Sequence, residues 1–414
     1  MTVSRALLGS AAWLTLGNIA RAVLQAMILL LLARNMPVDR YGTLVALVSL
    51  LMIFVPLIGA GYEFELLRKS SGGEPVRQAW YRYLSLVMLS ALLVMGLVFL
   101  CAHLFFDWPV DALSVSLLVF AELFAVRVLE GGNRLYQGQD RSLAIVKGRL
   151  TFVGLRLLGL VAVLSAGYSL GLSTYAGVCF VAALTFLLGW HVRLSAVFDV
   201  RPGLAWVSAE TWRQQVPTAI SFGFDRVMSN ADKLFVERLD SPAAVANYSV
   251  AARLVDLLCI PMLAFMTALQ PQIFRSGGRH GIDPRFYLVP VLYVGVLLPL
   301  FWCWGEAAVV WLLGASYTNA SGLLLLLLFM PITAFGKYIL TSRSIAASAQ
   351  GILIGSTFTA MCVNFLLNLW WVPDYGAQGA VAALLVGELL VIVSSWLGLH
   401  VAFRHRARRE SDAV

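Results

Sequence analysis

The sequence predicts an all-α polytopic membrane protein of about twelve transmembrane helices, in two six-helix lobes related by a parallel pseudo-two-fold axis along the membrane normal. Three observations predict this fold. Apolar residues make up 60% of the 414 residues and charged residues only 13%, about half the usual share of charge in a soluble domain. Apolar runs long enough to cross a bilayer recur along the chain. Residues in the first half recur in the second at one fixed offset.

The predicted spans each have close to the length that a transmembrane helix needs, about 17 to 25 residues. The first apolar run is too long for the core of a signal peptide and has no Ala-x-Ala cleavage site, so we expect it to be a span. The spans are predicted at residues 11–33, 41–62, 83–105, 112–132, 144–166, 172–192, 216–236, 244–269, 287–312, 320–340, 351–372 and 379–402.

Basic residues predict the orientation of these spans. With the N-terminus inside, the predicted cytoplasmic segments contain 21 Lys and Arg residues, whereas the outer loops contain only Arg34, Arg40 and Arg238. Lys and Arg are concentrated in the cytoplasmic loops of membrane proteins. Both termini are therefore predicted to be cytoplasmic.

An internal repeat predicts the domain organisation. A shift of 205 residues places four residues of the first half on similar residues of the second: Pro37 on Pro242, Pro56 on Pro261, Arg21 on Arg226 and Gln25 on Asn230. Two halves with an even number of helices run the same way through the membrane, which gives a parallel repeat. We expect an N-terminal lobe (1–194), a cytoplasmic linker (195–215), a C-terminal lobe (216–403) and a basic tail (404–414).

The paired prolines Pro56 and Pro261 lie inside the second and eighth spans, where each removes a backbone hydrogen bond and permits a kink. They are either ordinary membrane-helix prolines or a symmetry-related pair of hinges.

A polar stripe crosses the first span. Asn18, Arg21 and Gln25 share one helical face, and Arg21 lies near the middle of the span. A charge at that depth costs about 2.5 to 3.5 kcal/mol on insertion scales. We therefore expect this face to contact protein or water.

Six basic residues and at least five acidic residues lie at membrane depth, either as an internal salt-bridge network or as the lining of a hydrated cavity. Arg253 and Asp256 are i, i+3 neighbours, and Arg127 has Glu130 at the same spacing. The remaining cations are Arg21, Arg156, Arg226 and Lys233, and the remaining acids are Glu122, Asp225 and Asp232. Arg21 and Arg156 have no acid nearby in sequence, although Glu122 could pair across helices with one of them. Excess positive charge in a cavity suits an anionic substrate, and guanidinium groups suit phosphate oxygens.

Several function classes are excluded by the sequence. There is no GxxxxGK[ST] loop for ATP hydrolysis, and the spread-out basic residues argue against a nucleic-acid partner. We expect no enzyme activity, no metal or other cofactor and no disulfide, because the five histidines lack ligand spacing and the five cysteines all fall in spans.

Three segments together resemble the Wzx-type polysaccharide flippases of the multidrug/oligosaccharidyl-lipid/polysaccharide exporter superfamily. They are Leu31–Leu44, Asp232–Leu239 with Ala246–Arg253, and Asn364–Ala380. The resemblance implies a two-lobed, alternating-access flippase in the bacterial cytoplasmic (inner) membrane. Its cargo would be an undecaprenyl-diphosphate-linked oligosaccharide for surface polysaccharides such as O-antigen or exopolysaccharide, and its partners would include glycan polymerase or export proteins. In such proteins the first, second, seventh and eighth helices line the cavity.

On this hypothesis Arg21 and Arg253 hold the diphosphate, and Arg226 and Lys233 make secondary contacts. Further substrate contacts are expected from Asn18, Gln25, Arg127 and Arg156, and ion coupling from Asp225, Asp232, Asp256, Glu122 and Glu130. Two alternatives remain: a cation-coupled multidrug exporter, and a non-transporting scaffold for glycan assembly in which every membrane charge is locked in a pair.

Overall fold

In the computed structural model of the chain, the described residues are 2–106, 111–200, 203, 205, 206, 209–275, 282–347 and 349–412. Regular secondary structure in this part of the chain consists only of helices, which confirms the all-α prediction. Side chains are described for most of these residues, beginning at Trp13.

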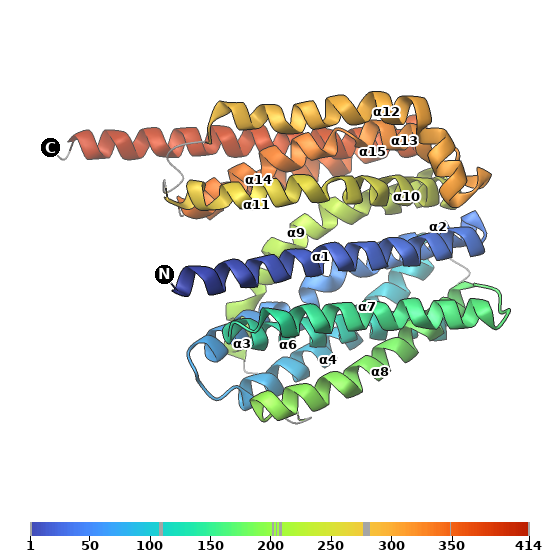
Figure 1. Ribbon diagram of the computed structural model, residues 1–414, viewed down its shortest axis with the longest axis horizontal. Helices are drawn as coiled ribbons and strands as arrows, with labels where there is room; N and C mark the ends of the chain where they lie inside the picture. Colours follow the sequence, from blue (N-terminus) through green and yellow to red (C-terminus); the bar gives the residue numbers. More distant parts are fainter. Residues whose placement is uncertain are drawn as a thin grey trace. The chain divides into compact units, whose positions relative to one another are not determined.

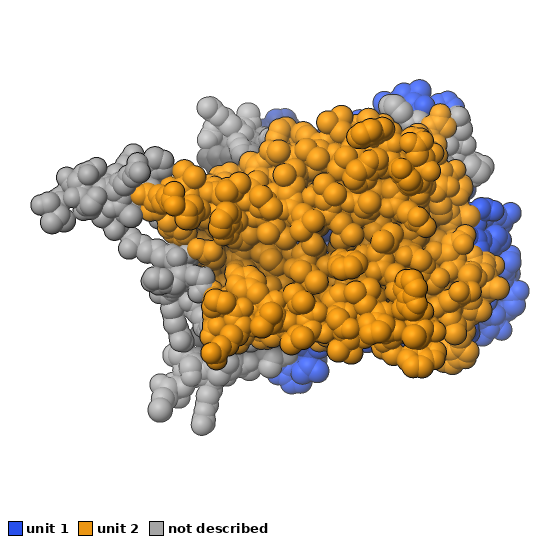
Figure 2. All heavy atoms as spheres, turned by 90° about the horizontal axis from the view of Figure 1, so that it is seen from above, with its two compact units in different colours: residues 1–226 blue, residues 227–414 orange. Residues whose placement is uncertain are grey.

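The chain divides into two compact units, residues 1–226 and 227–414, which are coloured separately in Figure 2. The helices of the first unit are α1 (Thr2–Asn35), α2 (Val38–Phe54), η1 (Val55–Gly61), α3 (Glu63–Ser71), α4 (Arg77–Cys101), η2 (Ala102–Phe106), α5 (Ala112–Leu118), η3 (Val119–Phe124), α6 (Ala125–Gly138), α7 (Ser142–Ser165) and α8 (Leu172–Phe198).

Helix α9 (Ala209–Leu239) begins in the first unit and continues into the second. The other helices of the second unit are α10 (Pro242–Leu258), α11 (Ile260–Arg275), η4 (Pro284–Tyr287), α12 (Leu288–Leu313), η5 (Ala315–Tyr317), α13 (Ala320–Leu327), α14 (Met330–Ala346) and α15 (Gln350–Asp412).

The predicted spans correspond to these helices. Eight of them match apolar helical segments of 22 to 30 residues, and a ninth segment of 54 residues, Gly351–Arg404, contains the last two. Helix α9 and the α10–α11 pair cover the remaining two predicted spans, 216–236 and 244–269. The chain is therefore a multi-pass membrane protein with the predicted twelve-span fold.

Within the first unit, α1 lies along α7 (Figure 1). The two backbones come close at Gly17, where a Cβ atom would lie 2.6 Å from the Cγ2 atom of Val146. Helix α3 packs on α6, and the Ser70 hydroxyl of α3 donates a hydrogen bond to the Leu135 carbonyl of α6 at 2.8 Å. On the exposed side of α3, a hydrogen bond from Arg68 lowers the pKa of Glu65.

The start of the predicted linker is attached to the first unit. Asp199 ends α8 in a left-handed conformation (φ +50°). Its carbonyl accepts a hydrogen bond from Arg77 Nε at the start of α4, and its carboxylate forms an ion pair with the Arg77 guanidinium group. The Ala205 amide donates to the Ser85 hydroxyl of α4 at 2.9 Å. The boundary between the two compact units falls further along, after Arg226 in α9.

Both paired prolines coincide with a break in their helix. α2 and α10 are each 17 residues long. A 3₁₀ segment with Pro56 at its start follows α2, and α10 ends at Leu258, one turn residue before the helix that contains Pro261. The two helix breaks are therefore separated by the same number of residues as the two halves of the sequence repeat. Each proline lacks the backbone N–H that would continue the helical hydrogen bonding. Their role as hinges stays a prediction.

In the second unit, α15 is two helices joined at Gly376, which has φ +55° and ψ −139°. The Asp240 carboxylate, in the α9–α10 turn, accepts the Ala377 amide at 3.1 Å. This contact joins the α9–α10 turn to the bend inside α15.

Candidate functional site

Three charged side chains on the fourth span, α5–η3–α6, each pair with a different partner in the first unit. Arg127 contacts Glu63 at 2.8 Å, Glu122 contacts Arg156 at 2.6 Å, and Glu130 contacts Arg149 at 3.1 Å. The expected Arg127–Glu130 pair was wrong, because Arg127 points to α3 and Glu130 points to α7. Ion pairs therefore connect the fourth span to α3, which directly follows the second span, and to the fifth span, α7.

Arg127 also stabilises the break at Pro56. Its Nε donates to the Ile58 carbonyl at 2.9 Å, and the Gly59 amide donates to the Ser90 hydroxyl at 3.0 Å. Backbone groups that leave the helical hydrogen-bond pattern near the proline thus find side-chain partners, as buried polar groups require. The side chains of Arg127 and Glu63 are only 10% and 9% exposed.

Arg156 is held in a similar way. It pairs with Glu122, donates to the Ala121 carbonyl at 3.0 Å, and lies over the Phe152 ring at 4.4 Å. Ala121 and Glu122 lie in the π-helical segment η3, where wider helical turns change which carbonyls are available. This confirms the alternative in which Glu122 pairs across helices.

The polar stripe on α1 contains two exposed residues, Asn18 and Gln25, and the half-buried Arg21. The described contacts of α1 are made mainly with α7. Arg21 therefore lies half-buried on a face whose other polar residues, Asn18 and Gln25, are exposed.

In the second unit, Asp232 lies at the centre of a cluster on α9 and α10. Its side chain is 1% exposed; one oxygen accepts the Tyr248 hydroxyl, and the other accepts the Lys233 amide at 2.8 Å and lies 3.6 Å from Lys233 Nζ. Lys233 Nζ also donates to the Ser229 carbonyl at 3.1 Å. Sequence reasoning missed Tyr248, although it lies in the polar run Asn247–Ser249 of α10.

The predicted Arg253–Asp256 pair forms at 3.3 Å, with side chains 63% and 59% exposed. Arg226, on α9, is also exposed. The side chain of Asp225 lies outside the part of the chain that the structure describes. A further pair joins Lys337 of α14 to Glu388 of α15 at 2.9 Å; the two residues lie 51 positions apart, so no local spacing predicts it.

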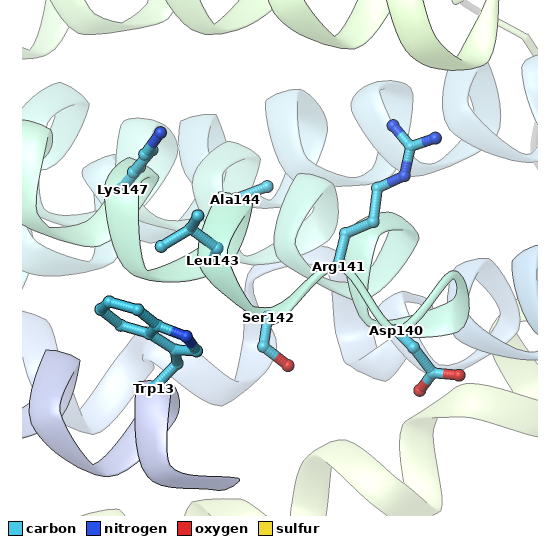
Figure 3. A pocket seen from close by; sticks show the side chains of 7 residues that line it. All are labelled: Trp13, Asp140, Arg141, Ser142, Leu143, Ala144 and Lys147. Carbon is cyan, nitrogen blue, oxygen red and sulfur yellow. The ribbon is translucent and has the colours of Figure 1, made fainter. Parts of the chain in front are cut away.

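A shallow pocket of about 440 Å³ lies between α1 and the start of α7 (Figure 3). Trp13 faces it from α1, and Asp140, Arg141, Ser142, Leu143, Ala144 and Lys147 line it from the other side. None of these residues belongs to the predicted site. Among the described residues there is also no group of three or more His, Cys, Asp or Glu side chains positioned to hold a metal ion.

Several solved structures share this fold at low sequence identity. An inward-facing multidrug resistance MATE family transporter of the MOP superfamily matches with a TM-score of 0.69 at 12% identity, over 96% of both chains. The lipid II flippase MurJ, in an inward closed conformation, matches with a TM-score of 0.73 at 10% identity, over 94% of this chain and 87% of its own. A mutant of the Vibrio cholerae MATE transporter VcmN matches with a TM-score of 0.62 at 13% identity, over 98% of both chains.

These likenesses establish the fold of the MOP superfamily, the multidrug/oligosaccharidyl-lipid/polysaccharide exporters. Residues 7–276, more than half of the chain, match the family described as "Polysaccharide biosynthesis protein". The chain belongs to this family. The recognition of a Wzx-type member of the superfamily is thereby confirmed. No curated protein sequence is significantly similar to the chain.

Proposed function

We propose that the protein is a flippase that moves an undecaprenyl-diphosphate-linked oligosaccharide from the cytoplasmic to the outer leaflet of a bacterial cytoplasmic membrane. It would act by alternating access, with both termini cytoplasmic, in the synthesis of a surface polysaccharide. Membership of the polysaccharide biosynthesis family supports this cargo. Glycan polymerase or export proteins would be its partners.

The observation that carries the proposal is the contrast between two kinds of membrane arginine. Arg127 and Arg156 are nearly enclosed by their carboxylate partners, whereas the Arg253 side chain is 63% exposed and the stripe around Arg21 has exposed polar neighbours. A diphosphate needs cations that its oxygens can reach, and guanidinium groups bind phosphate oxygens through two parallel hydrogen bonds. Arg21 and Arg253 are therefore the proposed primary contacts.

The other predicted residues take graded roles in this proposal. Arg226 and Lys233 are secondary contacts to the diphosphate, with Asn18 and Gln25 beside Arg21. Arg127 and Arg156 support the first unit and reach substrate only if their pairs with Glu63 and Glu122 open. Asp225, Asp232 and Asp256 are the proposed ion-coupling groups. Glu122 and Glu130 are further ion-coupling candidates, which pair with Arg156 and Arg149. Pro56 and Pro261 are the proposed hinges.

Transport by arginine variants tests the proposal. In proteoliposomes that contain a fluorescently labelled lipid-linked oligosaccharide, we expect Arg21→Ala and Arg253→Ala each to reduce flipping at least tenfold, since each loses a charge-assisted contact to phosphate. Arg68→Ala, an exposed arginine on α3, is the matched control and should flip at the wild-type rate. Undiminished transport by both membrane variants would remove these arginines from the substrate site.

A cation-coupled multidrug exporter is the second candidate, because MATE transporters have the same fold. Its cationic cargo suits an acidic site, whereas Glu122, Glu130, Asp232 and Asp256 each have a basic partner within 4 Å. Export of a cationic dye by the same proteoliposomes, without flipping of the oligosaccharide, would favour this candidate. A scaffold for glycan assembly would transport neither compound.

A further inference from the structure

The pocket between α1 and the start of α7 has an apolar side and a basic side. Trp13 lies beside Leu143 on the apolar side, whereas the side chains of Arg141 and Lys147 extend away from Trp13, in the same direction as each other (Figure 3). Both basic side chains are exposed, and neither forms an ion pair with a carboxylate in the part of the chain that the structure describes. Two cations are therefore accessible to an anion at this pocket.

The acidic residue of the pocket does not cancel this positive charge. Asp140 adopts a left-handed conformation (φ +55°) in the turn between α6 and α7, and its carboxylate points away from the Arg141 guanidinium group (Figure 3). Arg193 of α8 adds a third positive charge nearby, because Arg141 and Arg193 both interact electrostatically with Tyr136. The surface around the pocket therefore remains positive.

The apolar side of the pocket favours a lipid over a soluble anion. The side chains of Trp13 and Leu143 are 53% and 42% exposed. Both lie at the end of a span that the topology predicts to be cytoplasmic, and tryptophan is enriched where membrane helices meet the headgroup region. A free phosphate gains nothing from such a surface, whereas the glycerol and acyl groups of a phospholipid can contact it.

An exposed stripe leads from the pocket along α7 toward the middle of the span. The next residues on the face of Lys147, at spacings of four, three and four residues, are Thr151, Gly154 and Leu158. Leu158 is 66% exposed, and a Cβ atom at Gly154 would meet no atom within 4 Å. There is thus open space along the stripe in which an acyl chain can lie while its phosphate stays at the pocket.

We propose that this pocket binds an anionic phospholipid of the leaflet predicted to be cytoplasmic, with the phosphate held by Arg141 and Lys147 and one acyl chain along the exposed stripe of α7. Basic pockets between transmembrane helices on the cytoplasmic side of membrane proteins bind anionic headgroups. The ligand is a lipid of the surrounding bilayer and not the cargo, so the inference does not depend on the proposed function. Because the lipid contacts both α1 and α7, it stabilises the packing of these two helices.

Native mass spectrometry of the purified full-length protein in detergent measures the binding of each added lipid by its mass. The two lipids to compare are phosphatidylglycerol and phosphatidylcholine with identical acyl chains. We expect the wild type to bind phosphatidylglycerol about tenfold more tightly, since each Lys or Arg near an anionic lipid surface adds several-fold to the affinity. Equal affinity of the wild type for the two lipids would overturn the inference, whether or not any variant folds.

A double variant, Arg141→Gln with Lys147→Gln, tests the two cations. It should bind phosphatidylglycerol about tenfold more weakly than the wild type and phosphatidylcholine equally well. Arg68→Gln with Lys69→Gln is the matched control, because it removes the same charge from the same unit at two cations that already pair with Glu65 and Glu74. Loss of the lipid preference in both double variants alike would show a general attraction of charge and contradict a site at the pocket.

Gly154→Leu and a soluble anion separate a lipid site from a phosphate site. Gly154→Leu fills the open space beside the stripe and should weaken the binding of phosphatidylglycerol several-fold. In thermal melts, phosphatidylglycerol should raise the unfolding midpoint of the wild type but not that of the Arg141→Gln, Lys147→Gln variant, because a ligand of the folded state stabilises it. A rise caused by inorganic phosphate alone, and abolished in that variant, would assign the pocket to a free anion and overturn the lipid assignment.

Discussion

At the scale of single residues, the membrane arginines of the first unit show how the chain tolerates charge inside a bilayer. Each guanidinium group has a carboxylate and a backbone carbonyl as acceptors: Glu63 and Ile58 for Arg127, and Glu122 and Ala121 for Arg156. An uncompensated charge in the bilayer costs several kcal/mol, so these partners make insertion possible. Because these partners depend on the arginines, substitution of Arg127 or Arg156 is expected to destabilise the protein.

Arg127→Ala should therefore be strongly destabilising. The substitution leaves Glu63 buried without its cation and Ile58 without its donor, and the removal of one partner from a buried pair costs about 3–5 kcal/mol. A thermal melt of the purified protein in detergent should show a much lower midpoint. Arg149→Ala is the control, because its pair with Glu130 is 27% exposed on both sides and should contribute less. Equal midpoints for the two variants would contradict this account of Arg127.

At the scale of helices, proline and glycine define where spans bend and where they end. Pro56 and Pro261 each follow a 17-residue helix, and Gly376 joins the two halves of α15 with a positive φ. A Cβ at Gly376 would overlap an oxygen of Asp240, which is the residue that accepts the Ala377 amide. This turn requires glycine both for its backbone conformation and for space.

Gly376→Ala tests the requirement for glycine in this turn. We expect a loss of about 1–3 kcal/mol of stability, seen as a lower unfolding temperature in detergent, because an L side chain is strained at this φ and collides with Asp240. Gly355→Ala is a control in the same helix, where a Cβ meets no atom within 4 Å, and its midpoint should stay the same or rise. A Gly376→Ala midpoint as high as that of Gly355→Ala would contradict the expected strain.

At the scale of the whole molecule, an even number of spans predicts that both termini lie on one side of the membrane, and the distribution of Lys and Arg predicts that this side is the cytoplasm. The helix α3 and the turn after α9 then lie on opposite sides. Cysteine labelling of these two segments tests the orientation directly.

A single cysteine at Arg238→Cys should react with a membrane-impermeant maleimide in intact spheroplasts, whereas one at Arg68→Cys should react only after permeabilisation. Both variants would be made in a background in which the five native cysteines are replaced by alanine. Both residues are exposed, so accessibility to the reagent is not limited by packing. The reverse labelling pattern would show that the orientation of the protein in the membrane is opposite to the predicted one.

Ten of the twelve spans were predictable because they are apolar runs, and the breaks at the paired prolines were predictable because proline acts locally. The Arg253–Asp256 pair was visible for the same reason, as a spacing of three residues on one helix. The partners of Arg127 and Arg156 were not visible: Glu63 lies 64 residues before Arg127, and Glu122 lies 34 residues before Arg156. Packing between helices decides such contacts, and a single sequence does not display it. The roles of the predicted site residues remain proposals for the same reason.

Flipping of a labelled undecaprenyl-diphosphate-linked oligosaccharide by the purified wild-type protein in proteoliposomes tests the central claim most directly. The fraction of label that a membrane-impermeant quencher reaches from outside should change with time in vesicles that contain the protein, and not in protein-free vesicles. An unchanged distribution of the lipid, in vesicles whose protein is folded and correctly inserted, would contradict the assignment as a flippase.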